Sequence, residues 1–333
     1  MKPNYLQKND TIYLVAPSFG CTTKPYNIRL KKSISLFKKL EYNIIEGKNI
    51  WLNEGIMSSN NPIERANEIM DAYKSDASVV WSVGGGEVMC EILPYINFDL
   101  IKENPKWFVG FSDNTNLCYT ITTTLDIETI YGVNFPGMYN LEYDAKDTLD
   151  MLIGKNKFKG YKKWQETSKV TPLAKYTFGK RTKIIQYNYT TPIKGRIIGG
   201  CLDCLINLCG TKFDKTKEYI ERHKDEGIIF FMEACDLNPI SLRRALFQLK
   251  NSGWFDNVSM FIIGRSFNYK YKIMGQTMDN TYIDLLKEFN KPILLNVDLG
   301  HLAPSMPIKV GSVVTVEYNK DKHNIFYNYE DKI

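Results

Sequence analysis

Strand-like and helix-like segments alternate regularly along the first half of the chain. Apolar runs suited to buried strands occupy residues 11–18, 42–50, 77–86 and 106–112. Stretches with helical spacing of their apolar residues follow these runs, at 26–40, 61–75, 87–96 and 115–125. Buried strands that alternate with helices predict a mostly parallel sheet covered by helices on both faces. We therefore expect the first half to be a three-layer α/β sandwich.

The length of 333 residues exceeds what one hydrophobic core usually supports, so two domains are expected. We predict an N-terminal α/β domain over residues 1–155, a connector over 156–190 and a C-terminal domain over 191–333. Residues 155–183 carry ten Lys and Arg against Glu166 alone, and we interpret this basic run as a solvated connector. Beyond it, strand-like runs again alternate with helical stretches, and residues 311–330 predict a closing β-hairpin.

Three histidines are the candidates for a base that titrates near neutrality. His223 lies in a charged helical stretch, and His323 lies between two strand-like runs. His301 follows the apolar strand at 292–298 and precedes a Pro-rich turn, at the kind of strand end where open sheets bind ligands. If the chain is a hydrolase with a histidine base, His301 is that base.

Ser112 directly follows a strand and precedes a helix, as a nucleophile does on a sharp strand-to-helix turn. Gly110 offers the backbone room that such a turn requires. Asn114 stands where hydrolases of this kind carry a second glycine, and Asn tolerates unusual φ angles best after Gly. The alternative interpretation is that Ser112 only caps the following helix.

Glu233 ends an apolar strand, where a buried carboxylate requires a partner. With His301 as that partner, Glu233 would fix the imidazole tautomer and stabilise its charged form. The order Ser112, Glu233, His301 is one of the known orders of a catalytic triad. The alternative is a carboxylate that faces solvent at the strand end.

Three consecutive glycines, Gly84-Gly85-Gly86, follow the third strand of the first half. Glycine permits close approach and positive φ, so this turn can expose backbone N–H groups. Together with the amide of Asp113, the turn would supply the two donors of an oxyanion hole. Glycine triplets also form ordinary turns between strands and helices, so this signal is weak by itself.

No cofactor or metal is expected. Cys201, Cys204 and Cys209 have no fourth thiol or histidine nearby, and a helix packed on the sheet explains all three. Seven cysteines without an export signal indicate reduced thiols and a cytoplasmic location, and no stretch predicts a membrane span. The aromatic residues form no stacking motif with interleaved basic residues, so nucleic acid is not an expected partner.

The segments that hold these residues resemble the LD-carboxypeptidases (muramoyl-tetrapeptide carboxypeptidases). The resemblance is carried by ILPYINFDLIKENPKWFVGFSDNTNL, the early VAPS, GRIIGG before a helix ending CGT, FMEACD and NVDLGHLAP. It covers nearly the whole chain, most weakly over residues 140–190. It implies a serine peptidase with nucleophile Ser112, partners Glu233 and His301, and an oxyanion hole formed by the amides of Gly85 and Asp113.

The same resemblance implies an N-terminal sandwich similar to class I amidotransferases, a smaller C-terminal α/β domain and a homodimer. The implied reaction is hydrolysis of the amide bond to a terminal D-amino acid in murein peptides. Residues 81–85 read Trp-Ser-Val-Gly-Gly, whereas many members that cleave tetrapeptides have Ala-Arg-Gly-Gly before the turn. This form is more similar to the microcin C self-immunity branch, which cleaves peptide–nucleotide or aminoacyl-nucleotide toxins. Cys201 also departs from the family's pattern, because the family commonly has Asn at this position.

The substrate therefore remains open between a murein peptide and an aminoacyl-nucleotide. Trp164 is a candidate for stacking on a nucleobase, although such a residue more often packs. Arg196 and Arg265 are possible partners of a substrate anion. Two alternatives come from other functional classes: a binding module without catalysis, and a metal sensor built on the three clustered cysteines.

Overall fold

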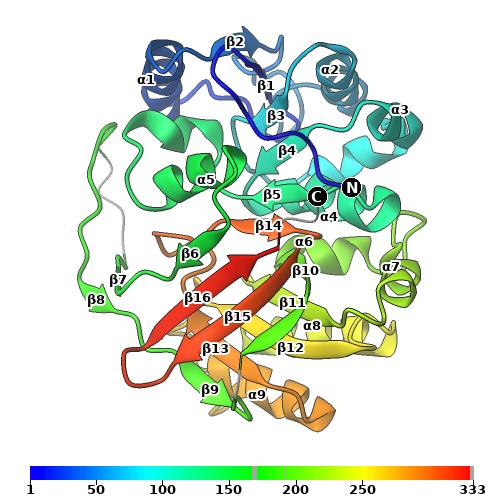
Figure 1. Ribbon diagram of the computed structural model, residues 1–333, viewed down its shortest axis with the longest axis vertical. Helices are drawn as coiled ribbons and strands as arrows, with labels where there is room; N and C mark the ends of the chain where they lie inside the picture. Colours follow the sequence, from blue (N-terminus) through cyan, green and yellow to red (C-terminus); the bar gives the residue numbers. More distant parts are fainter. Residues whose placement is uncertain (167–170, 191, 331–333) are drawn as a thin grey trace. The chain divides into compact units, whose positions relative to one another are not determined.

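Two separate β-sheets, each flanked by helices, organise the chain (Figure 1). The computed structural model describes residues 1–333 except 167–170, 191 and 331–333. The chain forms two units, of which the first contains Met1–Lys155, Lys169–Lys175 and Pro307–Val310. The second contains Asn156–Ser168, Tyr176–Met306 and Gly311–Ile333. The predicted α/β class is confirmed, but the units are equal in length to within one residue, so the second is not smaller.

The sheet of the first unit has six strands in the order β14-β5-β4-β3-β1-β2. Their bounds are β1 Thr11–Val15, β2 Asn43–Glu46, β3 Val79–Ser82, β4 Trp107–Gly110, β5 Thr129–Tyr131 and β14 Ile308–Val310. β1 to β5 run parallel, as predicted, and β14 pairs antiparallel with β5 at the edge. All residues of β3 and β4 are buried, as expected of strands with helices on both faces.

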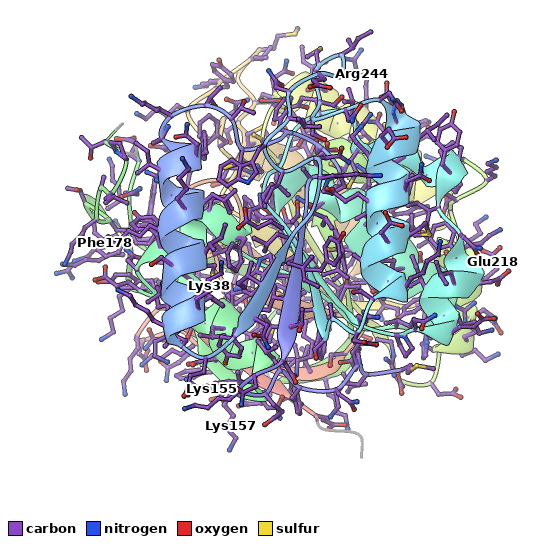
Figure 2. The ribbon with its side chains drawn as sticks, turned by 90° about the horizontal axis from the view of Figure 1, so that it is seen from above. Lys38, Lys155, Lys157, Phe178, Glu218 and Arg244 are labelled. Atoms are coloured by element: carbon purple, nitrogen blue, oxygen red, sulfur yellow. The ribbon has the colours of Figure 1, made fainter. Side chains whose placement is uncertain are left out.

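Helices lie on both faces of this sheet, and Figure 2 shows its strands running between α1 and α2. One face carries α1 Tyr26–Lys39, the 3₁₀ helix η3 Phe135–Tyr139 and α5 Asp144–Leu152. The other carries α2 Pro62–Lys74, η1 Met89–Tyr95, α3 Phe98–Glu103 and α4 Thr115–Leu125. The side chain of Asn61 caps α2 by accepting from the Glu64 amide at 3.0 Å, directly before the Pro that opens the helix.

The sheet of the second unit has eight strands in the order β6-β16-β15-β10-β11-β12-β13-β9. Their bounds are β6 Lys157–Lys159, β9 Ile185–Tyr187, β10 Ile193–Cys201, β11 Ile228–Glu233, β12 Val258–Gly264, β13 Ile293–Val297, β15 Val313–Asn319 and β16 Asn324–Tyr329. The four central strands β10 to β13 are parallel, and the outer strands pair antiparallel. β15 and β16 form the hairpin predicted over residues 311–330, drawn in red in Figure 1.

The helices of the second unit follow its parallel strands. They are α6 Leu202–Leu208, α7 Thr216–Arg222, α8 Pro239–Asn251, α9 Met278–Leu286 and η4 Lys287–Phe289. The stretch predicted as a basic connector contributes β6 and β9 to the sheet and forms a separate two-stranded ribbon, β7 Lys163–Trp164 with β8 Lys180–Arg181. Among the described residues, no helix is long and apolar enough to cross a membrane.

Candidate active site

Ser112 lies on a sharp turn between β4 and α4 in the first unit. The strand ends at Gly110, and Ser112 opens the short 3₁₀ helix η2 Ser112–Asn114, which leads into α4. Its φ of +62° lies in the left-handed region, which a non-glycine residue adopts only when its surroundings enforce it. Phe111 and Asn114 occupy the cap positions of η2 and α4, so Ser112 is not the helix cap of the alternative interpretation.

Gly110 and Asn114 shape this turn in a way that corrects one expectation. Asn114 has an ordinary helical φ of −62°, so the idea that it provides an unusual φ is wrong. Its Nδ2 instead donates to the carbonyl oxygens of Gly84 at 2.8 Å and Phe111 at 2.9 Å. A Cβ on Gly110 would lie 2.5 Å from the Asn114 Cβ, so the glycine is required to admit this side chain.

The glycine turn after β3 lies beside the Ser112 side chain. A Cβ built on Gly85 would lie 3.3 Å from the Cβ and 3.5 Å from the Oγ of Ser112. The structure therefore brings Gly85 next to Ser112, with Asp113 adjacent in sequence. Hydrogen bonds to its carbonyl oxygens hold the glycine turn in place. Besides the bond from Asn114, Gly84 O accepts from the Ser82 hydroxyl at 2.9 Å, and Gly85 O accepts from the Phe19 amide at 3.1 Å.

The Asp113 side chain connects three segments around the turn, which the sequence did not indicate. Its Oδ2 accepts from the Ser18 hydroxyl at 2.5 Å and from the Met89 amide at 2.9 Å. Its Oδ1 accepts from Asn116 Nδ2 at 2.9 Å. Burial raises the pKa of this carboxyl, while the hydrogen bonds from Ser18 and Met89 oppose that rise. Asp113 thus ties the backbone that follows the glycine turn, at Met89, to the side chains of Ser18 and Asn116.

Glu233 and His301 meet at the carboxyl edge of the second sheet. Glu233 is the last residue of β11 and is fully buried, which excludes the alternative of a solvent-facing carboxylate. His301 lies in the turn after β13, and its Nδ1 is 2.9 Å from Glu233 Oε2. Gly300 has a φ of +102°, and a Cβ there would lie 2.9 Å from Glu233 Oε2. This glycine therefore lets the histidine turn approach the carboxylate.

The environment of His301 favours its charged form. Burial by itself would lower the imidazole pKa, but the charge of Glu233 and the hydrogen bonds that the ring makes with the side chains of Cys235 and Glu233 raise it well above its ordinary value. Burial raises the pKa of the Cys235 thiol, and its hydrogen bond to His301 partly opposes this. The pair is therefore arranged to stabilise an imidazolium, as a base requires once it has taken a proton.

A buried ion pair supports the turn that carries His301. Asp298 Oδ1 accepts from Arg265 Nη1 at 2.6 Å and from the Thr182 hydroxyl at 2.9 Å. Arg265 lies over the Trp164 ring at 5.1 Å, and Trp164 is 7% exposed. Arg196 is likewise paired with Glu226. Both arginines that were possible anion partners are therefore committed to carboxylates, and Trp164 packs against its own unit.

The clustered cysteines lie at and after the end of β10. Cys201, Cys204 and Cys209 are buried thiols outside any disulfide, and Cys201 pairs in register with Glu233 on the neighbouring strand. Within the described part of the chain, no group of three or more His, Cys, Asp or Glu side chains is arranged to hold a metal ion. The metal-sensor interpretation has no site among these residues.

Comparisons with known proteins establish the family. A model of the LD-carboxypeptidase N-terminal domain matches residues 12–132, and a model of the C-terminal domain matches residues 194–316. The chain belongs to the LD-carboxypeptidase family. The first match contains Ser112, and the second contains Glu233 and His301.

Relatives of two kinds match over nearly the full length. The chain is 23% identical to the microcin C7 self-immunity protein MccF of Escherichia coli, covering 97% of this chain and 95% of the relative. It is 23% identical to a probable murein peptide carboxypeptidase of Bacillus subtilis, covering 93% and 90%. The structure of MccF in complex with aspartyl sulfamoyl adenosine matches with a TM-score of 0.83 at 21% identity, covering 99% of both chains. This likeness shows a shared fold.

The predicted site residues form two groups. Ser112, Asp113 and Gly85 lie together in the first unit, and Glu233 and His301 lie together in the second. Sequence reasoning missed the side chains of Asn114 and Asp113 as links to the glycine turn. Their only sequence signal was their position directly after Ser112.

Proposed function

We propose that this protein is a serine peptidase that hydrolyses the amide bond to a terminal D-amino acid in murein peptides. The observation that carries the proposal is the contact between His301 Nδ1 and the buried Glu233 carboxylate at 2.9 Å. A carboxylate in this position holds an imidazole with Nδ1 protonated, so that Nε2 acts as the base. The family membership supplies the reaction class.

In the proposed mechanism Ser112 attacks the carbonyl carbon of the scissile amide. His301 accepts the hydroxyl proton, and the amides of Gly85 and Asp113 stabilise the negative charge on the carbonyl oxygen. His301 then donates that proton to the leaving amine, which departs as the free D-amino acid. Water then attacks the acyl-serine ester while His301 takes its proton, and His301 returns that proton to the Ser112 oxygen as the shortened peptide leaves. No cofactor takes part.

The raised pKa of His301 sets the expected pH dependence of this reaction. Only neutral imidazole can accept the proton of Ser112, and the Glu233 charge favours the imidazolium. The rate should therefore rise with pH through the raised pKa rather than through the ordinary histidine value. A pH profile of kcat/KM for the wild-type enzyme measures this rise on its acid side directly.

The test is release of D-alanine from a muropeptide that ends in D-alanine. Wild type should release it, and Ser112→Ala should reduce the rate to background. Ser33→Ala is the matched control, because Ser33 is a buried serine of the first unit whose hydroxyl donates to Pro136 O at 3.2 Å. Equal activity of wild type and Ser112→Ala would remove Ser112 from the mechanism.

A second candidate keeps this chemistry and changes the substrate to an aminoacyl-nucleotide. It is supported by residues 81–85, which resemble the self-immunity branch, and by the match to MccF, a relative solved in complex with aspartyl sulfamoyl adenosine. The packing of Trp164 against Arg265 and Tyr269 leaves this side chain little surface for a nucleobase. We therefore rank the murein peptide first.

The two substrates are separated in one assay plate. The muropeptide and an aminoacyl sulfamoyl adenosine are incubated in parallel with wild type and Ser112→Ala. Cleavage of the sulfamoyl adenosine alone would establish the second candidate. Loss of both activities in Ser112→Ala would show that one nucleophile serves whichever substrate is cleaved, and labelling by a serine-directed phosphonate would exclude a binding module without catalysis.

A further inference from the structure

The proposed oxyanion hole depends on where two backbone N–H bonds point, and the first turn of α4 controls both. A peptide unit is planar and trans, so its C=O and the following N–H point in opposite directions. Holding a carbonyl oxygen therefore fixes the direction of the N–H on the next residue. We infer that Asn114 and Thr115 are positioning residues that aim the amides of Gly85 and Asp113.

Asn114 holds the carbonyl that precedes the Gly85 amide. Its Nδ2 donates to Gly84 O at 2.8 Å, and Gly84 O lies in the same peptide unit as the Gly85 N–H. Glycines have more backbone freedom than other residues, so this unit needs an external restraint to stay in one orientation. Asn114 supplies such a restraint from two positions after Ser112, alongside the Ser82 hydroxyl, which donates to the same oxygen at 2.9 Å.

Thr115 holds the carbonyl that precedes the Asp113 amide. Its Oγ1 donates to Ser112 O at 2.6 Å, and Ser112 O shares a peptide unit with the Asp113 N–H. Ser112 itself has a φ of +62°, so the orientation of this unit is not the one its own backbone preference would give. The hydroxyl of the fully buried Thr115 thus adds a second bond to Ser112 O, beside the one from the Thr115 backbone N–H, and helps to retain the strained turn.

Asn114 has the position of a helix cap but does not use its side chain as one. It is the N-cap residue of α4, where an Asn normally accepts a hydrogen bond from a first-turn amide, yet no such bond forms. Its buried Oδ1 has no hydrogen-bond partner among the described residues, while its Nδ2 reaches across to Gly84. An unused cap with its donor aimed at the glycine turn is better explained by positioning than by helix stability.

The substitution Thr115→Val tests the inference, because it removes the hydroxyl and keeps the shape. We expect kcat to fall about ten- to a hundredfold with little change in KM, since a misaimed donor affects the transition state more than substrate binding. Thr115→Ser retains the hydroxyl and should restore most of kcat. Thr120→Val is the matched control: Thr120 is buried in the same helix, and its hydroxyl donates to Asn116 O at 2.6 Å rather than to a carbonyl of the turn.

A second measurement reports the N–H directions without relying on activity. Residual dipolar couplings of the Gly85 and Asp113 amides measure the orientation of each N–H bond. Thr115→Val should change the Asp113 coupling and Asn114→Ala the Gly85 coupling, whereas Thr120→Val should change neither. If Asn114→Ala does not fold, Thr115→Val still decides the matter.

The inference rests on the proposed function, and the two can fail separately. Changed couplings in a protein whose wild type cleaves neither substrate would overturn the proposed function and leave the aiming of the amides supported. An active wild type whose kcat changes less than twofold in Thr115→Val would overturn the inference. Unchanged couplings in Thr115→Val would overturn it as well.

Discussion

Replacement of Glu233 by Gln removes the charge beside His301 while keeping the shape of the side chain. Glu233 Oε2 lies 2.9 Å from His301 Nδ1 and is fully buried, so solvent screens the pair weakly. In the proposed mechanism the imidazole becomes positively charged when it takes the proton of Ser112. The Glu233→Gln enzyme must form that charge without a neighbouring carboxylate, so its transition state is less stable.

The size of the loss follows from the geometry. Two unit charges at 2.9 Å attract by about 6 kcal/mol at an effective dielectric constant of about 20. At about 1.4 kcal/mol for each factor of ten, this corresponds to a fall of about 10⁴ in kcat. Replacing the carboxylate by its amide in another triad lowers kcat by about 10⁴ as well, there through the wrong imidazole tautomer.

The pH profile of Glu233→Gln provides a second test, because the variant should be slower at its maximum and yet become active at lower pH. The Glu233 charge raises the His301 pKa, so its removal lowers that pKa and leaves more neutral imidazole at a given pH. The acid limb of the kcat/KM profile should therefore move to lower pH in Glu233→Gln, although the maximal rate falls. A steady-state assay of D-alanine release across the pH range measures both quantities in one experiment.

Glu226→Gln is the control for this substitution. Glu226 Oε2 lies 3.4 Å from His223 Nδ1 in the same unit, so the change removes a glutamate–histidine pair away from the proposed site, together with the ion pair between Glu226 and Arg196. It should leave kcat and the acid limb unchanged. A Glu233→Gln enzyme that kept more than a tenth of the wild-type kcat, or whose acid limb stayed in place, would refute the reasoning.

Two further predictions concern stability. Burial raises the pKa of the Glu68 carboxyl from 4.5 to about 7. Between these two values the folded protein holds a proton that the unfolded chain has released. The free energy of unfolding should therefore fall by about 3 kcal/mol as the pH rises through this interval. Urea unfolding at pH 5 and pH 8 should show this loss in wild type and a flatter response in Glu68→Gln. Glu64→Gln is the control, because this side chain is 40% exposed. An unchanged pH response in Glu68→Gln would contradict the prediction. Asp298→Asn leaves Arg265 buried without its carboxylate at 2.6 Å and should cost about 3–5 kcal/mol. The exposed pair of Arg243 and Asp284 at 3.4 Å is the comparison, where Asp284→Asn should cost less than about 1 kcal/mol, and similar losses in both variants would refute the argument.

The sequence predicted the parallel core of the first sheet and the central strands of the second because their signal is local. Runs such as Val79–Ser82 and Ile228–Glu233 are buried throughout and apolar up to their last residue, as is typical of strands covered on both faces. The short edge strands escaped prediction. Ile308–Val310 is three residues long, and Lys157–Lys159 alternates two exposed lysines with one buried Phe. Such segments become strands only because a partner strand is available.

In the candidate site too, the residues with a local sequence signal were predicted and the contacts between distant segments were not. Strand ends identified Ser112, Glu233 and His301, and the contact between Glu233 and His301 is present in the structure. The partners of the Ser112 turn could not be predicted, because they come from segments distant in sequence. Asp113 accepts from Ser18, 95 residues earlier, and Asn114 donates to Gly84, 30 residues earlier. Side-chain type alone cannot reveal which distant carbonyl a donor will reach.

The edge strand β14 has a consequence for how this chain is made. A ribosome synthesises Ile308–Val310 only after most of the second unit, although these residues complete the sheet of the first. Until they emerge, β5 lacks its antiparallel neighbour and presents unpaired backbone groups that can template aggregation. The sheet of the first unit is therefore incomplete until β14 has been synthesised. In a fragment truncated after Lys155, the edge of β5 that pairs with β14 would stay unpaired.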